Sequence, residues 1–155
     1  MKKEVTETKK RNNKGFSLVE LIVVIAIMAV LMVVLAPAML RYVEKSRVQK
    51  DESAAAEVAH AVELALAQED IYVEAGTVSG TSGSFTITLT GSTGAMTFPA
   101  SATKLKADVE ATVGTTVKMS SKTHSAQTYT ITVTYNATRQ AYEVVGAWPT
   151  ATPTT

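Results

Sequence analysis

The chain has 155 residues, no cysteine and a formal net charge of +1. Its length allows one soluble domain at most once a long apolar run is set aside. Without cysteine it has no disulfide, no thiol nucleophile and no cysteine metal site. The nearly neutral charge gives no electrostatic basis for binding nucleic acid, so no specific nucleic-acid site is predicted.

Positive charge is concentrated at the start of the chain. Residues 1–15 hold six basic and two acidic side chains, a net charge of +4, whereas the remaining residues have a net charge of −3. The cations directly precede an apolar run from Phe16 to Leu40. A bilayer-spanning helix needs about 20 apolar residues, so this run is long enough. The positive-inside rule then predicts a cytoplasmic N-terminus, with the rest of the chain outside.

Two processing sites are open from the residues alone. A secretory signal has an apolar core of about 7–15 residues followed by a small-residue cleavage site. The run here is longer, although Ala36-Pro37-Ala38 offers a weak site of that kind. The favoured site lies in front of the run, at Gly15. Glycine is compatible with cleavage there, since it has no side chain to obstruct a protease cleft and has a permissive backbone.

The stretch KGFSLVE, residues 14–20, is followed by unbroken apolar sequence. It closely resembles the class III signal of type IV pilins and the related pseudopilins. The resemblance covers the leader and the N-terminal helix, about a third of the chain. It implies that a membrane-embedded prepilin peptidase cuts between Gly15 and Phe16 and methylates the new amino group of Phe16. The apolar run stays on the mature protein, first as a membrane anchor and later as filament core.

Glu20 is the carboxylate near the front edge of the apolar run. An ionisable group in lipid costs roughly 2.5–3.5 kcal/mol at a helix centre, and less near the interface. The resemblance implies that Glu20 attracts the cationic N-terminus of a neighbouring subunit during assembly. A buried carboxylate favours such a partner because an unpaired buried charge is costly. The alternative is a carboxylate that only reaches into the headgroup region.

Helical periodicity continues beyond the membrane run. Between Ala54 and Asp70, small and branched apolar residues recur at i, i+3 and i+4 on one face. We therefore expect nearly continuous helix from Phe16 to about Asp70, roughly 80 Å long. Pro37 interrupts this helix and predicts a kink, because it removes one intrahelical hydrogen bond. Pilins commonly carry a proline at the corresponding place, which resembles a site that loosens when subunits pack; a plain membrane-helix proline is the alternative.

The last part of the chain predicts a small antiparallel sheet. Apolar residues alternate with threonines over residues 85–90 and 129–135, and residues 142–147 predict a third strand, joined to the second by a short hairpin link. The helix face with Val58, Val62 and Leu66 can cover the apolar side of the sheet.

Shorter elements are expected between these strands. Gly76 to Gly83 predicts a turn segment. Residues 101–113 predict a short helix, capped by Ser101 and ending at Gly114. A weak strand is expected near residues 115–119, and Trp148 is expected to cover the sheet edge.

These patterns predict an α+β fold. A long N-terminal α-helix, transmembrane in its first half and amphipathic in its second half, packs on a small antiparallel β-sheet head. The expected parts are a leader peptide (1–15), a transmembrane and assembly helix (16–40), an amphipathic helix continuing into the head (41–74), the sheet head (75–148) and a Thr/Pro tail (149–155).

No enzyme activity, cofactor or metal is predicted. His60 and His124 stand alone in the sequence and are expected at the surface, and there are no cysteines or paired carboxylates at zinc-ligand spacing. Asp108 and Glu110 lack the acidic, glycine-punctuated loop that calcium requires, so a solvated helix face is the preferred interpretation. Residues 136–138 match a glycosylation sequon, but a hairpin turn is the simpler interpretation.

Three functions are compatible with this sequence. The first, favoured by a threonine-rich head without an evident calcium loop, is a structural subunit of a type IV pilus. The second is a pseudopilin of a type II secretion system, and the third is a membrane-anchored adhesion module that never polymerises. The partners implied are prepilin peptidase, identical or related pilin subunits, the pilus assembly platform with its ATPase, and the cytoplasmic membrane. The expected location is a single-pass cytoplasmic membrane protein with its N-terminus inside, and a cell-surface filament after assembly.

Overall fold

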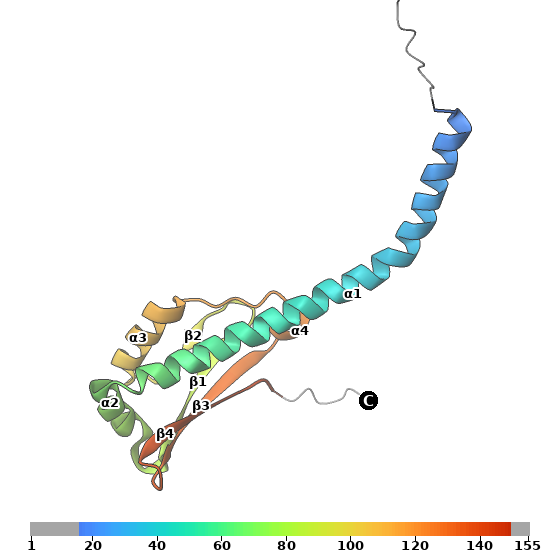
Figure 1. Ribbon diagram of the computed structural model, residues 1–155. Coiled ribbons are helices and arrows are strands. Elements are labelled where there is room, and N and C mark those ends of the chain that lie inside the picture. The colour runs from blue at the N-terminus through green and yellow to red at the C-terminus, as the bar shows by residue number, and fades with distance from the viewer. Residues whose placement is uncertain (1–15, 150–155) are drawn as a thin grey trace, which may run out of the picture. The chain divides into compact units, whose positions relative to one another are not determined.

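The computed structural model describes residues 16–149. The chain divides after Leu40 into two compact units (Figure 1). Helix α1, Leu18–Ala65, contributes to both of them. The predicted leader, residues 1–15, and nearly all of the predicted tail lie outside the described residues.

The first unit contains the apolar part of α1. All described side chains from Phe16 to Leu40 are exposed. By length and composition α1 can cross a membrane, with a mean hydropathy of 3.2 over its most apolar window. Pro37 lies inside the helix. The predicted kink there stays a prediction.

The second unit contains a four-stranded antiparallel sheet in the order β2-β1-β3-β4. The strands are β1 (Ser84–Thr90), β2 (Met96–Thr97), β3 (Thr128–Asn136) and β4 (Ala141–Ala147). The three longer strands match the three predicted from alternation. In the central pair, Ile87 lies opposite Ile131, and both side chains are fully buried.

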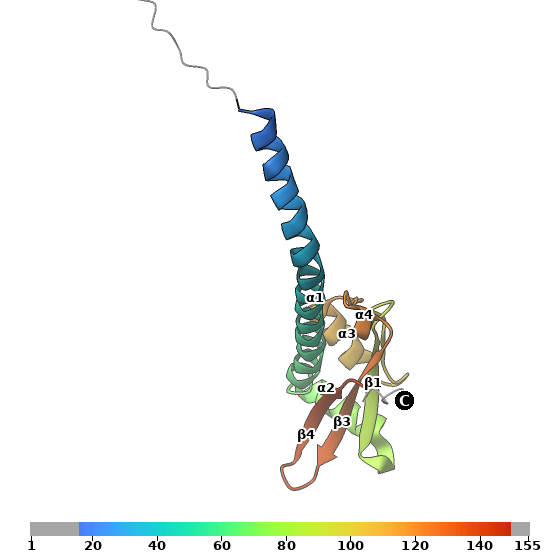
Figure 2. The same cartoon turned by 90° about the vertical axis from the view of Figure 1, so that its right-hand side faces the viewer.

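One face of the sheet is covered by the second half of α1 (Figure 2). Val58 and Val62 are fully buried and Leu66 is 6% exposed. This is the face that the sequence predicts. Burying a branched aliphatic side chain contributes about 1.5–3 kcal/mol, so these contacts are a main source of head stability.

The long helix ends earlier than predicted. It stops at Ala65 rather than near Asp70, and α2 (Glu69–Ser79) follows after a tight turn. Helix α2 also occupies the first half of the segment predicted as a turn, Gly76 to Gly83, and a short 3-10 helix, Gly80–Ser82, follows it. The reason is tertiary, because Ile71 and Ala75 are 2% and 1% exposed and hold α2 against the core.

Helix α3 (Thr103–Val113) has the predicted extent, inward side chains and end. Leu105 and Val109 are buried, and Gly114 follows with a φ of 88°. The predicted cap is wrong, because Ala102 rather than Ser101 holds the N-cap position and gives no side-chain bond. The predicted strand near residues 115–119 is also wrong, since only an isolated bridge forms there, at Thr116.

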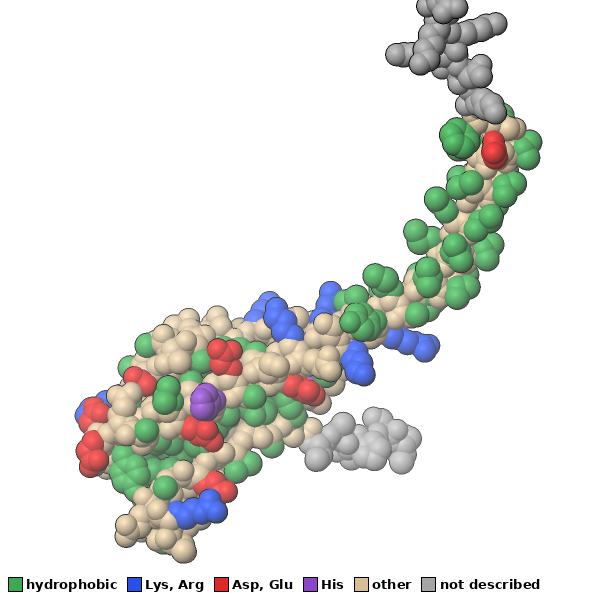
Figure 3. All heavy atoms as spheres, in the orientation of Figure 1, with side chains coloured by type: hydrophobic (Ala, Val, Ile, Leu, Met, Phe, Trp, Pro, Cys, Tyr) green, Lys and Arg blue, Asp and Glu red, His purple; other side chains and the backbone are tan. Residues whose placement is uncertain are grey.

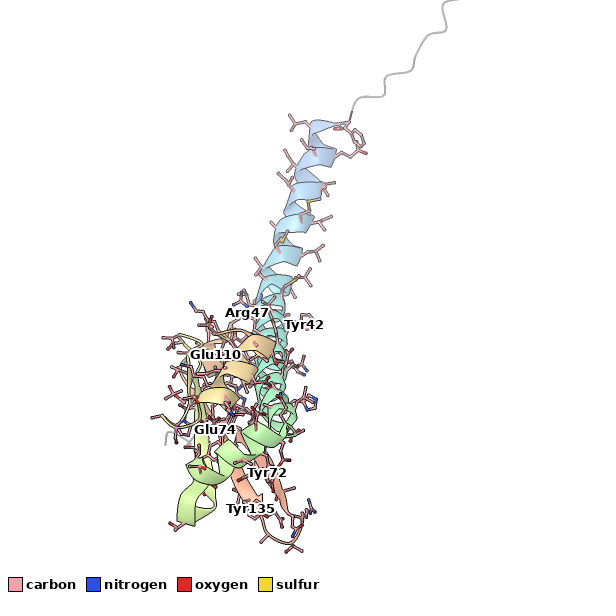
Figure 4. All side chains as sticks on the ribbon, turned by 90° about the vertical axis from the view of Figure 1, so that its left-hand side faces the viewer. Tyr42, Arg47, Tyr72, Glu74, Glu110 and Tyr135 are labelled. Atoms are coloured by element: carbon pink, nitrogen blue, oxygen red, sulfur yellow. The ribbon has the colours of Figure 1, made fainter. Side chains whose placement is uncertain are left out.

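The cap of α3 comes from α2. The Glu74 carboxylate accepts hydrogen bonds from the backbone amides of Thr103, Lys104 and Leu105, at 2.9–3.0 Å. These are first-turn donors with no partner inside the helix. A negative charge is also favourable at a helix N-terminus. Glu74 therefore binds α2 to α3 (Figure 4).

Two acidic side chains of α1 hold the segment before α4 (Lys122–Ser125). The Asp51 carboxylate, 2% exposed, accepts hydrogen bonds from the amides of Ser120 and Ser121 at 2.7–3.1 Å. Glu44 accepts one from the Lys122 amide at 2.6 Å. This loop is thereby bound to the helix that also covers the sheet.

The two histidines differ from each other. His60 is exposed, as expected, and its ring lies 3.3 Å from Glu63. His124 is only 5% exposed, so the expectation of a surface residue is wrong for it. Its ring stacks on Trp148, with centroids 4.0 Å apart and an interplanar angle of 7°. Burial follows because α4 turns this side chain inward against the end of β4.

We predict that Asp51→Asn lowers the free energy of unfolding of the head by about 1–2 kcal/mol, because charge-assisted hydrogen bonds become neutral ones. The measurement is thermal unfolding of the full chain in detergent, followed by circular dichroism. Glu52→Gln is the matched control, since Glu52 is exposed and adjacent. Equal stability of the Asp51→Asn variant and the control would contradict this role.

A second prediction concerns acid stability. Burial raises the pKa of Asp51 and Glu74, but the hydrogen bonds that their carboxylates accept outweigh it, and both pKa values lie below their ordinary 3.8 and 4.5. A lowered folded-state pKa contributes stability above the unfolded pKa, and this is lost as pH falls through the folded value. We expect the Tm to fall from about pH 5 downward.

The matched variant for this measurement is Glu74→Gln, which has no carboxylate to protonate. Its Tm should be lower than that of the parent chain at pH 7, and the difference should shrink as the pH is lowered. A difference that stays constant between pH 7 and pH 3 would show that Glu74 does not contribute through its charge.

Candidate processing and assembly site

The site begins at Phe16, the first described residue, whose side chain is 89% exposed. The carbonyl of Ser17 accepts a hydrogen bond from the Leu21 amide at 3.2 Å, which makes Ser17 the N-cap of α1. The helix therefore starts two residues after the predicted cleavage point. Gly15, on the other side of that point, lies outside the described residues.

Glu20 lies in the first turn of α1. Its carboxylate accepts a hydrogen bond from the Ser17 amide at 3.2 Å. Serine at the N-cap with glutamate three residues later is the capping-box pattern, and this bond is one half of it. The carboxylate is also placed favourably against the positive end of the helix dipole. Glu20 thus lies next to the position where cleavage would create the amino group of Phe16.

The surface beyond Glu20 is apolar on all sides. Among the described residues before Arg41, Glu20 is the one ionisable side chain. Val23, Ile27 and Val30 help to line a shallow apolar groove of about 340 Å³. Hydrophobic side chains cover the visible face of this segment (Figure 3). A helix that is apolar all round is stable only inside a membrane or packed against other protein.

Comparison with family models gives one match. Residues 10–36 match the prokaryotic N-terminal methylation motif. The matched stretch includes Gly15, Phe16 and Glu20, and Pro37 lies just beyond it. The chain therefore carries the N-terminal segment of a type IV pilin-like prepilin with a class III signal peptide. Neither the comparison with curated proteins nor that with solved structures finds a match.

The motif and the apolar helix together support a type IV pilin-like or pseudopilin-like protein. The described chain is built as a long apolar helix and a small α+β head. Both features fit a membrane-anchored pilin. Proteins with this motif are structural rather than enzymatic.

Other residues considered from the sequence occupy structural positions. Within residues 16–149 there is no group of three acidic, histidine or cysteine side chains that could hold a metal ion. Glu110 lies 3.9 Å from Lys106 on the same face of α3. The Asn136 side chain accepts hydrogen bonds from the amides of Thr138 and Arg139 at 3.1 and 3.2 Å. This closes the β3–β4 hairpin, in agreement with the turn interpretation.

Sequence reasoning missed three features of the head. Asp51 was detectable in principle, because it shares a helix face with Ala55 and Val58, where a carboxylate needs a partner. Glu74 gave no local signal, since its partners lie 29 to 31 residues away. The third feature is a cluster of three tyrosines beside α2, which come from two separate parts of the chain.

Proposed function

We propose that this protein is a structural subunit of a type IV pilus, cleaved after Gly15, N-methylated at Phe16 and polymerised through its apolar N-terminal helix. The observation that carries the proposal is the surface of residues 16–40, which is apolar on all sides and has one carboxylate at its front. A simple membrane anchor has no use for that charge.

Cleavage after Gly15 would convert the amide of Phe16 into an amino group by hydrolysis of one peptide bond. The exposed Phe16 and the helix start at Leu18 support access, because Phe16 lies outside the hydrogen-bonded helix. Prepilin peptidase would catalyse this hydrolysis, which leaves a carboxylate on Gly15 of the released leader. It would then transfer a methyl group from a sulfonium methyl donor to the new amino group, which loses one proton. The product is a cationic N-terminus at the positive end of the helix dipole, where a positive charge is unfavourable.

Glu20 would offset that charge in two successive environments. In the separate subunit its carboxylate accepts from its own Ser17 amide. In a filament, close packing of apolar helices removes water, and an unpaired carboxylate there becomes costly. Pairing with the N-terminus of a neighbouring subunit removes this cost and sets the axial position of one helix against the next. Head-to-tail contacts of this kind generate open filaments when they do not close into a ring.

A pseudopilin of a type II secretion system is the second candidate, since it shares the N-terminal features. The outward faces of β1 and β3 favour the pilus. Their paired residues include Thr86 with Thr132 and Thr88 with Thr130. Such an uncharged polar coat suits the exterior of a long filament exposed to water.

Mass spectrometry of the protein from its native host tests the processing step. We expect a mature chain that begins at N-methylated Phe16. Gly15→Val should retain the leader, because a branched side chain now occupies the protease cleft. A chain that keeps Met1 to Gly15, or one that starts near Ala38, would instead indicate an ordinary anchor or a secreted domain.

The Glu20→Ala variant tests the assembly step. Removing the charge lowers the cost of membrane insertion, so we expect normal amounts in the membrane and loss of sheared surface filaments. Glu52→Ala is the matched control, because it removes an exposed carboxylate from the same helix outside the apolar segment. An unchanged filament yield in Glu20→Ala would refute the proposed role.

A further inference from the structure

The head contains an aromatic groove between α2 and the β3–β4 hairpin. We call it the tyrosine groove, and its volume is about 320 Å³. Its lining consists of Tyr72, Val73, Gly76, Ser79, Gly80, Gly83, Tyr135 and Tyr142. Ligand pockets in proteins begin at about this size. None of the lining side chains carries a charge.

The three tyrosine rings pack on each other. The ring of Tyr142 lies 5.0 Å from that of Tyr72, edge to face, and 5.4 Å from that of Tyr135. The Tyr72 hydroxyl donates to the carbonyl of Gln140 at 3.0 Å, which joins α2 to the hairpin. Figure 4 shows Tyr72 and Tyr135 at this end of the head. These contacts fix the three rings relative to one another and to the hairpin.

Apolar surface remains exposed in the groove. Val73 is 61% exposed and Tyr135 is 38% exposed. Desolvation and the neighbouring Tyr135 hydroxyl raise the pKa of Tyr72, so its phenol stays neutral at physiological pH. The groove therefore favours an uncharged occupant with apolar groups and backbone acceptors.

The chain itself contains a segment of this chemistry. Residues 150–155 read TATPTT, with no charged side chain, and Pro149 precedes them. Aromatic-lined grooves bind proline-containing segments in extended conformation, because proline loses little entropy on binding. Proline rings and threonine methyl groups pack on aromatic faces. We propose that the tyrosine groove of one subunit binds residues 150–155 of a second copy.

The geometry of β4 favours a second copy over the same chain. Strand β4 starts at the hairpin, beside the groove, and ends at Ala147 on the opposite end of the sheet. Returning from Pro149 to the level of Tyr142 requires about 24 Å of extended chain. Residues 150–155 span at most about 22 Å. This segment therefore does not reach the groove of its own head.

The groove and Pro149, which precedes residues 150–155, lie at opposite ends of the same sheet, so each contact would leave a free groove on one subunit and a free segment 150–155 on the next. Such a contact is heterologous, and it propagates into an open filament when the rotation between subunits does not close a ring. The inference thus deepens the proposed pilus function, on which it rests. It adds a contact between heads to the packing of the apolar helices.

Disulfide trapping in assembled filaments tests the inference. Because the chain has no native cysteine, only the introduced thiols can form disulfides. The pair Val73→Cys with Thr152→Cys places one thiol in the groove and one in the tail. After mild oxidation, we expect a ladder of covalent dimers, trimers and higher species on non-reducing gels. The matched control combines Thr152→Cys with Thr112→Cys, an exposed position on α3 outside the groove, and should give no ladder.

The other outcomes overturn the inference in distinguishable ways. Filaments without cross-links exclude the contact, and a cross-linked monomer means that the tail binds its own head. An equal ladder in the control pair means unspecific contact. If the unmodified chain forms no filaments, the proposed pilus function fails with it.

A second measurement covers the case in which the variant with both cysteines does not form filaments. A labelled peptide of residues 149–155 is titrated onto the full chain in detergent and followed by fluorescence anisotropy. We expect saturable binding, weakened at least tenfold by Tyr135→Ala. Absent binding, or binding that Tyr135→Ala leaves unchanged, would overturn the proposal.

Discussion

The structure depends on one helix, α1, whose two halves suit different environments. Before Arg41 every described side chain of α1 is exposed and nearly all are apolar, whereas after Ala54 one face is buried against the sheet and the other is polar. The first pattern is stable only in lipid or among other helices. The second covers the apolar side of a sheet that would otherwise lie open to water.

Carboxylates hold the rest of the head together. Asp51 and Glu74 each accept several backbone hydrogen bonds from segments far away in sequence. A small head without disulfides has few other means of fixing its loops. Burial of these groups is tolerated because their charges are satisfied, and this makes head stability depend on their ionisation. Glu20 follows the same principle at the front of α1, where its partner is the Ser17 amide.

Much of this protein was predictable because its signals are local. Residues 14–20 carry the resemblance that the matched methylation motif supports, and the apolar run after Phe16 forms the predicted helix. The threonine alternation predicts β1 and β3, since a period of two is a property of the strand itself. Gly15, Phe16 and Glu20 lie within the matched methylation motif, and no tertiary contact was needed to find them.

Tertiary structure decided the features that depend on contacts between residues far apart in the sequence. Helix α2 forms in the first half of the predicted turn segment because Ile71 and Ala75 are buried in the core of the head. Glu74 caps α3 in place of Ser101. His124 is buried because the ring of Trp148, which follows β4, stacks on it. The tyrosine groove likewise joins α2 to a hairpin about 60 residues later. A sequence pattern indicates whether a segment is polar or apolar and whether it has helix or strand periodicity. Burial and capping depend instead on which other segment of the chain packs beside it.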